Sequence, residues 1–299
     1  MNNKLKGNFM LLLTAIIWGT SFIATKSGVE SMGPFAFNSI RSFIGGLTLL
    51  PIILLFKRYG RLDDKGEKKS DLIVGGVLCG LALFFAGAFQ QLGIVYTTVG
   101  KAGFITAMYV VLVPVIQVLF GKKVKIQIWV CVIMALVGFC LLCMPEFGQI
   151  GIGDLLIFAA AIFFAVHILV IDYYVDRVDS IKLSCIQFFS CGAIAILGII
   201  LDQTFGVEPL RVNGVVSCAL PLLYSGVLSC GVAYTLQVVA QKKTNSILAS
   251  LILSLESVFA VISGMLIFGE RMVAREMIGC IIIFAAVISA QFFSDEKNI

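Results

Sequence analysis

Residues 281–288 read Ile-Ile-Ile-Phe-Ala-Ala-Val-Ile, and residues 10–17 read Met-Leu-Leu-Leu-Thr-Ala-Ile-Ile. These runs are apolar on every side, whereas a half-exposed helix or strand repeats its apolar residues every 3.6 or two positions. Apolar residues fill 60% of the 299 positions and charged residues only 13%. Soluble domains have about 45–50% apolar and about 25% charged residues. A chain of this length cannot bury such an excess, so the surrounding solvent is lipid.

Ten apolar runs are each long enough to cross a bilayer core of roughly 30 Å as a helix. They cover residues 8–25, 35–56, 72–92, 101–120, 126–144, 154–172, 181–201, 216–238, 246–269 and 275–293. The first run follows two lysines, as in a signal peptide, but nine further spans follow it and we expect it to remain uncleaved. Membrane strands would alternate apolar and polar residues, which these runs do not. The expected fold class is therefore all-α, a polytopic membrane protein with ten transmembrane helices.

The distribution of basic residues predicts how the chain lies in the membrane. If the N-terminus is cytoplasmic, Arg41 lies inside a span and 16 of the 22 basic residues fall in cytoplasmic segments. The five that fall outside are Lys26, Lys101, Arg211, Arg271 and Arg275. Because positively charged loops resist translocation, we expect a multi-pass protein of the cell membrane with both termini in the cytoplasm. This asymmetry explains the net charge of +5 without a nucleic-acid partner.

The two halves of the chain align with each other at a shift of about 146 residues. The shift matches Gly7 with Gly153, Trp18 with Phe164, Arg41 with Gln187, Gln91 with Gln237 and Gly103 with Ala249. Because each half holds five spans, the second half is inverted relative to the first. We expect residues 1–145 and 150–293 to form two inverted five-helix repeats, an arrangement typical of secondary transporters whose halves rock around a central site.

Short motifs are spread over both halves. They are Trp18-Gly19-Thr20-Ser21-Phe22, Pro34 with Arg41 seven positions later, Tyr96-Thr97-Thr98, Leu112-Val113-Pro114-Val115, Leu255-Glu256-Ser257-Val258-Phe259 and Gly269-Glu270-Arg271. On these motifs the chain resembles EamA-type members of the drug/metabolite transporter superfamily over nearly its whole length. The resemblance implies ten helices and transport of small metabolites, often amino acids, by alternating access. Gly121-Lys122-Lys123 departs from the family's usual Gly-Glu pair, and Ser257 replaces its common proline.

Charged side chains inside apolar spans are costly, so we expect them to face a cavity or a partner. Glu256 lies about ten residues into the ninth span, near mid-bilayer at about 1.5 Å per residue, and is either a substrate- or proton-binding carboxylate or a structural group. Arg41 either holds a substrate carboxylate or serves the fold by reaching a helix end or the membrane surface. His167, the only histidine, is either a proton relay or a buried core group.

Five further residues are predicted to complete an aromatic, weakly polar substrate pocket: Trp18, Gln90, Tyr109, Tyr234 and Gln237. Plain packing between helices is the alternative for each of them. Pro114 is expected to interrupt the fourth helix and to free carbonyl groups that line a cavity.

Motifs for other chemistry are weak. Gly151-Ile152-Gly153-Asp154 is similar to a motif of intramembrane aspartyl proteases, but Asp154 is placed to cap its helix and no second aspartate is expected to face it. Cys140 and Cys143 form a C-x-x-C without the second pair that a metal site needs. We therefore expect no catalytic residue, no cofactor and no metal.

The sequence thus favours a secondary carrier that moves a small metabolite, such as an amino acid, with export as the expected direction. Uptake of a vitamin, amine or sugar-like solute stays open, as does a membrane-embedded enzyme; a channel would show polar rings or a filter sequence. The expected partners are the small-molecule substrate, the lipid bilayer and the proton as a candidate coupling ion. Whether the chain forms a homodimer is left open.

Overall fold

The computed structural model describes residues 3–62, 66–97, 99–143, 150–205, 214–268 and 273–293, which form helices and contain no strand. The first half consists of α1 (Asn3–Met32), α2 (Pro34–Arg58), α3 (Lys69–Ile94), α4 (Val99–Ala107), α5 (Tyr109–Leu119) and α6 (Ile126–Cys143). The second half consists of α7 (Ile152–Tyr174), α8 (Ser180–Phe205), α9 (Gly214–Ser217), α10 (Ala219–Leu223), the π-helix η2 (Tyr224–Tyr234), α11 (Thr235–Gln241), α12 (Ser246–Leu253), α13 (Glu256–Phe268) and α14 (Ala274–Phe293).

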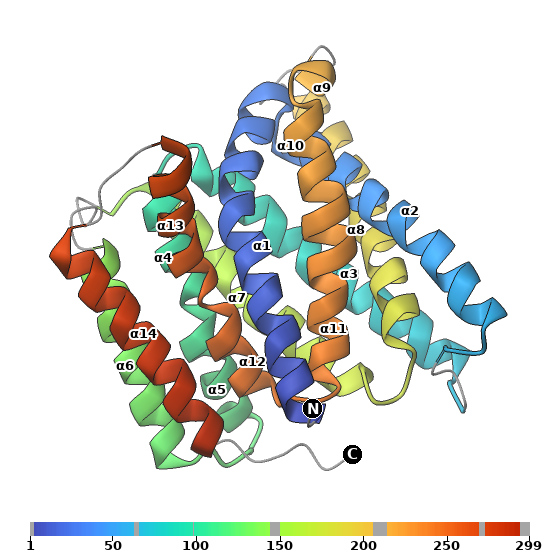
Figure 1. The fold of residues 1–299 in the computed structure, drawn as a ribbon. Helices are drawn as coiled ribbons and strands as arrows, with labels where there is room; N and C mark the ends of the chain where they lie inside the picture. The colour runs from blue at the N-terminus through green and yellow to red at the C-terminus, as the bar shows by residue number, and fades with distance from the viewer. Residues whose placement is uncertain are drawn as a thin grey trace.

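Nine helical segments of this described part are long and apolar enough to cross a membrane, and the shorter apolar helix Ile126–Leu142 adds a tenth. Each expected span falls on one of these segments, so the ten-helix fold class is confirmed. α1 begins and α14 ends at the same end of the bundle (Figure 1). We call this the lower end and the opposite one the upper end. The predicted motif residues Thr98 and 269–271, together with Arg211, lie outside the described residues.

Helices of the two halves interleave. α3 packs against α7 and α8, α2 packs against α8, and α6 packs against α14. Glycines on α3 permit a close approach, because a Cβ at Gly80 would lie 2.6 Å from the Cβ of Ser190 and 2.7 Å from the carbonyl oxygen of Gln187. Small residues of this kind let helix backbones pack closely in a membrane.

The fourth span is discontinuous, but not at Pro114 as the sequence predicted. Pro114 lies inside α5, and the break between α4 and α5 falls at Met108, six residues earlier. A proline lacks the amide hydrogen and crowds the carbonyl one turn before it. That carbonyl belongs to Val110, so Pro114 does not by itself account for the break at Met108. At the break, the amides of Val111 and Leu112 both donate to the carbonyl of Met108, at 3.0 and 3.2 Å.

The ninth span is also discontinuous, which the sequence did not predict. α12 ends at Leu253 and α13 begins at Glu256, with a turn at Ser254 and Leu255. Met108 and Ser254 are separated by 146 residues, the shift that relates the two halves. Both repeats therefore break the same helix at the same place, as expected for carriers built from inverted repeats.

Candidate functional site

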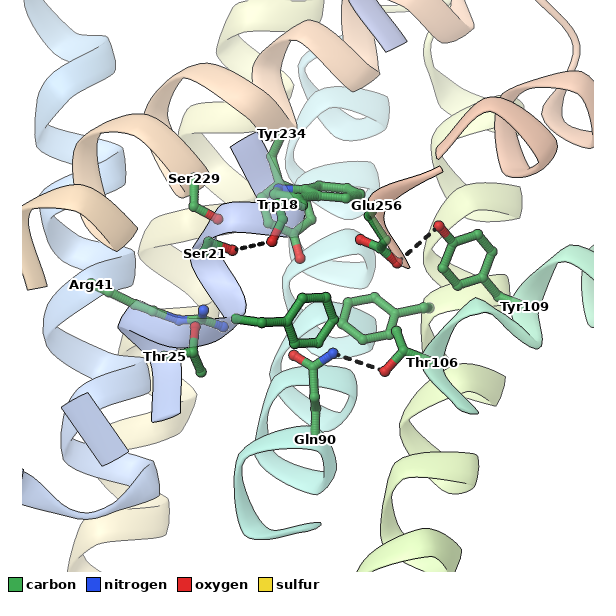
Figure 2. A pocket seen from close by; sticks show the side chains of 12 residues that line it. Trp18, Ser21, Thr25, Arg41, Gln90, Thr106, Tyr109, Ser229, Tyr234 and Glu256 are labelled. Carbon is green, nitrogen blue, oxygen red and sulfur yellow. Dashed lines mark hydrogen bonds between the residues drawn. The ribbon is translucent and has the colours of Figure 1, made fainter. Parts of the chain in front are cut away.

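A pocket lies between the two halves, close to both helix breaks (Figure 2). Its lining comes from α1, α2, α3, α4, α5, α7, η2 and α13: Trp18, Ser21, Phe22, Thr25, Arg41, Gln90, Thr106, Tyr109, Phe164, Ser229, Tyr234 and Glu256. The cavity volume is about 30 Å³, room for about two water molecules. Sites that enclose a drug-sized ligand measure about 300–1,000 Å³, so the pocket is too small for a metabolite in this structure and its side chains must separate to admit one.

Glu256 and Tyr109 join the two broken helices at the pocket. Each is the first residue of its half-helix, and the Tyr109 hydroxyl donates to Glu256 Oε1 at 3.0 Å (Figure 2). The neighbouring Ser257 hydroxyl donates to the carbonyl of Gly103 at 2.9 Å. A proline at position 257 could not make this second link between α13 and α4, so the departure from the family's pattern has a structural consequence.

Arg41 is buried and projects toward the pocket (Figure 2). Its Nε donates to Asn38 Oδ1 at 3.2 Å. With the Gln91 amide oriented to satisfy both of its ends, a terminal nitrogen of Arg41 donates to the Gln91 oxygen at 2.9 Å. Both partners are neutral, and no carboxylate of the described residues lies within ion-pair distance of the guanidinium. The arginine therefore does not reach the membrane surface, and it leaves an uncompensated positive charge beside the pocket.

The remaining wall is aromatic and weakly polar. The rings of Trp18 and Tyr234 are 4.4 Å apart between centroids, and Gln90 Nε2 donates to Thr106 Oγ1 at 3.1 Å. Trp18 Nε1 is buried without a hydrogen-bond acceptor among the described residues. Since buried donors are nearly always paired, a bound solute or water is a natural acceptor for this indole.

The structure brings six of the eight predicted site residues to the pocket, and leaves His167 and Gln237 outside its lining. His167 Nε2 lies 3.0 Å from Gln187 Oε1, and its ring packs edge-on against Tyr234, with centroids 5.7 Å apart. Gln237 Nε2 donates to Gln241 Oε1 at 3.0 Å. Both residues thus lie behind the wall of the pocket, and the binding roles of all eight stay predictions.

Six lining residues were not predicted: Ser21, Phe22, Thr25, Thr106, Phe164 and Ser229. Two signals could have found most of them. Ser21, Phe22 and Thr25 follow Trp18 at helical spacing and share its face, and Thr106 precedes Tyr109 by three residues. Phe164 is the repeat partner of Trp18, so the alignment of the halves pointed to it.

A second polar cluster lies at the upper end, away from the pocket. Lys101 Nζ donates to Asp154 Oδ2 at 2.6 Å, and both side chains are buried. The Thr97 hydroxyl and the Gly151 amide donate to the same carboxylate, at 3.0 and 2.9 Å. Gly151 is the N-cap residue of α7 and Asp154 is the third residue of that helix, so Asp154 contributes to the cap by accepting from the Gly151 amide and not from the N-cap position itself. The ion pair with Lys101 was not predicted.

Comparison with known proteins agrees with this architecture. The model of the EamA-like transporter family matches residues 5–144 and again residues 151–290. An uncharacterized transporter of Archaeoglobus fulgidus is 35% identical over 286 residues, which covers 95% of this chain and 85% of the relative. An uncharacterized transporter of Clostridium kluyveri is 27% identical, with 98% and 94% covered. A solved crystal structure, 18% identical, superposes with a TM-score of 0.77 and covers 96% of this chain and 97% of that one.

The doubled family match fits two five-helix repeats, and the names of the relatives indicate a membrane transporter. This chain belongs to the EamA-like transporter family, within the drug/metabolite transporter type that its motifs resemble.

Proposed function

We propose that the protein is a secondary carrier that exports a small metabolite, such as an amino acid or related compound, by alternating access. The observation that supports this best is the pocket where the two broken helices meet, lined by both halves and by the buried side chains of Arg41 and Glu256. Residues 1–145 and 150–293 are then the units that rock, and the small pocket seen here is one state of the cycle.

Arg41 binds an anionic group of the solute, most simply a carboxylate. Its hydrogen-bond partners Asn38 and Gln91 hold the guanidinium in place without neutralising it. A carboxylate accepts two parallel hydrogen bonds from a guanidinium, which a neutral amide cannot match. Trp18 and Tyr234 supply apolar contact for the rest of the solute.

Glu256 carries the coupling proton. Its carboxylate lies at the start of a half-helix, beside the pocket and bonded to the Tyr109 hydroxyl, which is neutral. Each time the pocket opens to one side of the membrane, this carboxylate meets the water of that side and can exchange a proton there.

Transport in reconstituted vesicles tests the proposal. Purified protein is assayed with a panel of labelled amino acids and amines, first for exchange across the membrane and then for accumulation driven by a pH gradient. Glu256→Gln should keep exchange and lose pH-driven accumulation, because exchange needs no net proton movement. Glu276→Gln, a carboxylate change near the upper end of α14, is the matched control. Unchanged pH-driven accumulation in Glu256→Gln would dismiss proton coupling through this residue.

Arg41→Gln tests the anion contact in the same vesicles. Hydrogen bonds to charged groups contribute about 1.5–3 kcal/mol, so KM for an anionic or zwitterionic solute should rise roughly 10- to 150-fold. Amines without an anionic group should be affected far less.

The direction of transport is measured in cells. Cells that produce the wild-type protein should accumulate less solute than cells that produce Glu256→Gln. Greater accumulation with the wild-type protein would indicate uptake.

A further inference from the structure

A second cavity, at the lower end of the bundle, is about ten times larger than the central pocket. Its volume is about 310 Å³, against about 30 Å³ for the pocket. We call it the vestibule. It lies where α5, α7, α12 and α14 come together at the connection between α5 and α6, and the residues that define it here are Gln117, Lys122, Lys123, Lys125, Asp172 and Ser246.

The lining of the vestibule carries an excess of positive charge. Three lysines from the connection between α5 and α6 face one carboxylate, Asp172. Lys122 Nζ lies 3.7 Å from Asp172 Oδ2, and its side chain is 61% exposed. A pair at this distance whose cation is exposed contributes little. The vestibule therefore presents a positive potential that concentrates anions inside a concave wall.

The vestibule and the central pocket are both lined by one face of α5. Gln117 Nε2 donates to Ser246 Oγ at 2.7 Å, and both residues are buried. Tyr109, Val113 and Gln117 share one face of α5 at four-residue spacing. Tyr109 lines the pocket and Gln117 lines the vestibule, about 12 Å apart along the helix at about 1.5 Å per residue. One buried valine and one hydrogen bond thus stand between the two cavities on this face.

We propose that the vestibule is a second solute-binding site, which takes the anionic group of a solute, a carboxylate or phosphate, at the closed lower mouth of the path. This deepens and rests on the proposed carrier function. The charge distribution along the chain predicts that the lower end faces the cytoplasm, and on that orientation a solute docks in the vestibule before export. Opening of the Gln117–Ser246 contact then leads the solute toward Arg41.

The phosphate of an anionic lipid shares this chemistry, but the polar floor favours a soluble solute. Gln117, Asn245 and Ser246 make that floor polar, and the walls add the apolar side chains of Val124, Ile128, Ile247 and Phe293. An acyl chain can contact those walls, but it cannot pair with the polar groups of the floor. The experiment separates the two sources.

The test uses the full-length protein in a detergent with an uncharged head group and without lipid. Inorganic phosphate and succinate are titrated separately at constant ionic strength while the thermal unfolding midpoint is measured. The wild-type protein should show a saturable rise of about 2–4 °C at several-fold excess of anion over Kd. The triple variant Lys122→Gln/Lys123→Gln/Lys125→Gln should lose this rise. All three lysines are exposed, so the variant should fold, and its midpoint without anion checks this.

The matched control neutralises three other cations at the same end. Lys57→Gln/Arg58→Gln/Arg61→Gln changes exposed residues at and just beyond the end of α2, outside the lining of the vestibule. This variant and Arg41→Gln should keep the rise. If both triple variants lose the rise equally, the rise reflects the overall charge of the protein and not a site. If only Arg41→Gln loses the rise, the anion binds in the central pocket. Either result overturns the proposal.

Vesicles distinguish the remaining outcomes. A rise that appears only with phosphatidylglycerol in the bilayer, and never with soluble anions, would make the vestibule a lipid site and overturn the proposal. An intact anion response in a protein that exchanges no solute would instead refute the carrier function, because the vestibule would bind anions without transport following.

Discussion

The two ends of the bundle carry the same junction, built from repeat-related residues. At the upper end, the start of α7 crosses the end of α3, and a Cβ at Gly153 would lie 2.8 Å from the carbonyl oxygen of Gly93. At the lower end, the start of α1 crosses the end of α11, and a Cβ at Gly7 would lie 3.0 Å from Thr244 Oγ1 and 3.3 Å from the carbonyl oxygen of Ala240. A glycine at the same repeat position thus lets helices of opposite halves meet at each end.

The junctions differ in charge. The upper one contains the buried ion pair of Lys101 and Asp154. At the lower one, the position of Asp154 is taken by Asn8, which accepts a hydrogen bond from Thr244 at 3.2 Å, and the position of Lys101 is taken by Ile247. Both junctions thus contain the close glycine contact, but only the upper junction contains a buried ion pair. If the halves rock as proposed, the upper end separates only at the cost of a buried ion pair, and we expect the two ends to open unequally.

The largest effect should come from removing the charge at the upper junction. Asp154→Asn keeps a side-chain oxygen that can cap α7 but takes the carboxylate away from the buried Lys101. Breaking a buried ion pair at one partner costs about 3–5 kcal/mol, whereas Asn8→Ala, the matched change at the lower junction, removes one neutral hydrogen bond worth about 1 kcal/mol. Thermal unfolding in detergent compares the two. Equal midpoints would mean that the ion pair adds nothing to the upper junction.

The close approach of the helices should be the next most sensitive feature. Gly153→Ala places a methyl group 2.8 Å from the backbone oxygen of Gly93, which cannot move without shifting α3. Overpacking of this kind costs about 1–3 kcal/mol. Gly7→Ala meets Thr244 Oγ1 at 3.0 Å, Lys243 Cβ at 3.2 Å and the carbonyl oxygen of Ala240 at 3.3 Å. These neighbours need to shift by only a few tenths of an ångström, so we expect a cost below about 1 kcal/mol.

The yield of folded protein after detergent extraction and the unfolding midpoint both measure this difference. A Gly7→Ala variant as unstable as Gly153→Ala would show that the lower junction is as tightly packed as the upper one.

Much of the fold could be predicted because few backbone structures can span a lipid bilayer. A run of about 20 apolar residues must form a helix in a bilayer, so the ten spans follow from composition alone. The break before Glu256 could not be found in this way, because residues 246–255 contain no proline or glycine. The structure instead shows contacts with the other half at this break, from Tyr109 to Glu256 and from Ser257 to Gly103.

The candidate site was partly predictable for a similar reason. A charged group such as Arg41 or Glu256 inside an apolar span must face something polar, and both line the pocket. The position of His167 outside the lining could not be predicted, because a buried histidine can face a neighbouring helix as well as a cavity, and only the crossing of the helices decides between them. The ion pair at the upper junction was missed because its partners begin different spans, where sequence analysis counts them as separate loop charges.

The smallest difference between the two junctions should come from a single hydroxyl at each. The Thr97 hydroxyl donates to the carboxylate of Asp154 at 3.0 Å, and the Thr244 hydroxyl donates to the side-chain oxygen of Asn8 at 3.2 Å. Valine has nearly the shape of threonine, so Thr→Val removes the hydrogen bond with little change in packing. A hydrogen bond to a charged group contributes about 1.5–3 kcal/mol and one between neutral groups about 0.5–1.5 kcal/mol. Thr97→Val should therefore lower the unfolding midpoint about twice as far as Thr244→Val.

Combining Thr97→Val with Asp154→Asn, which removes the charge of the acceptor, sharpens this comparison. In Asp154→Asn the acceptor is neutral, so Thr97→Val should then cost no more than Thr244→Val does in the wild-type protein. If Thr97→Val instead costs the same with either acceptor, the carboxylate does not strengthen that bond. The asymmetry between the two ends would then come from Lys101 and from the closer helix crossing at Gly153, because the threonine contacts would be equivalent in both repeats.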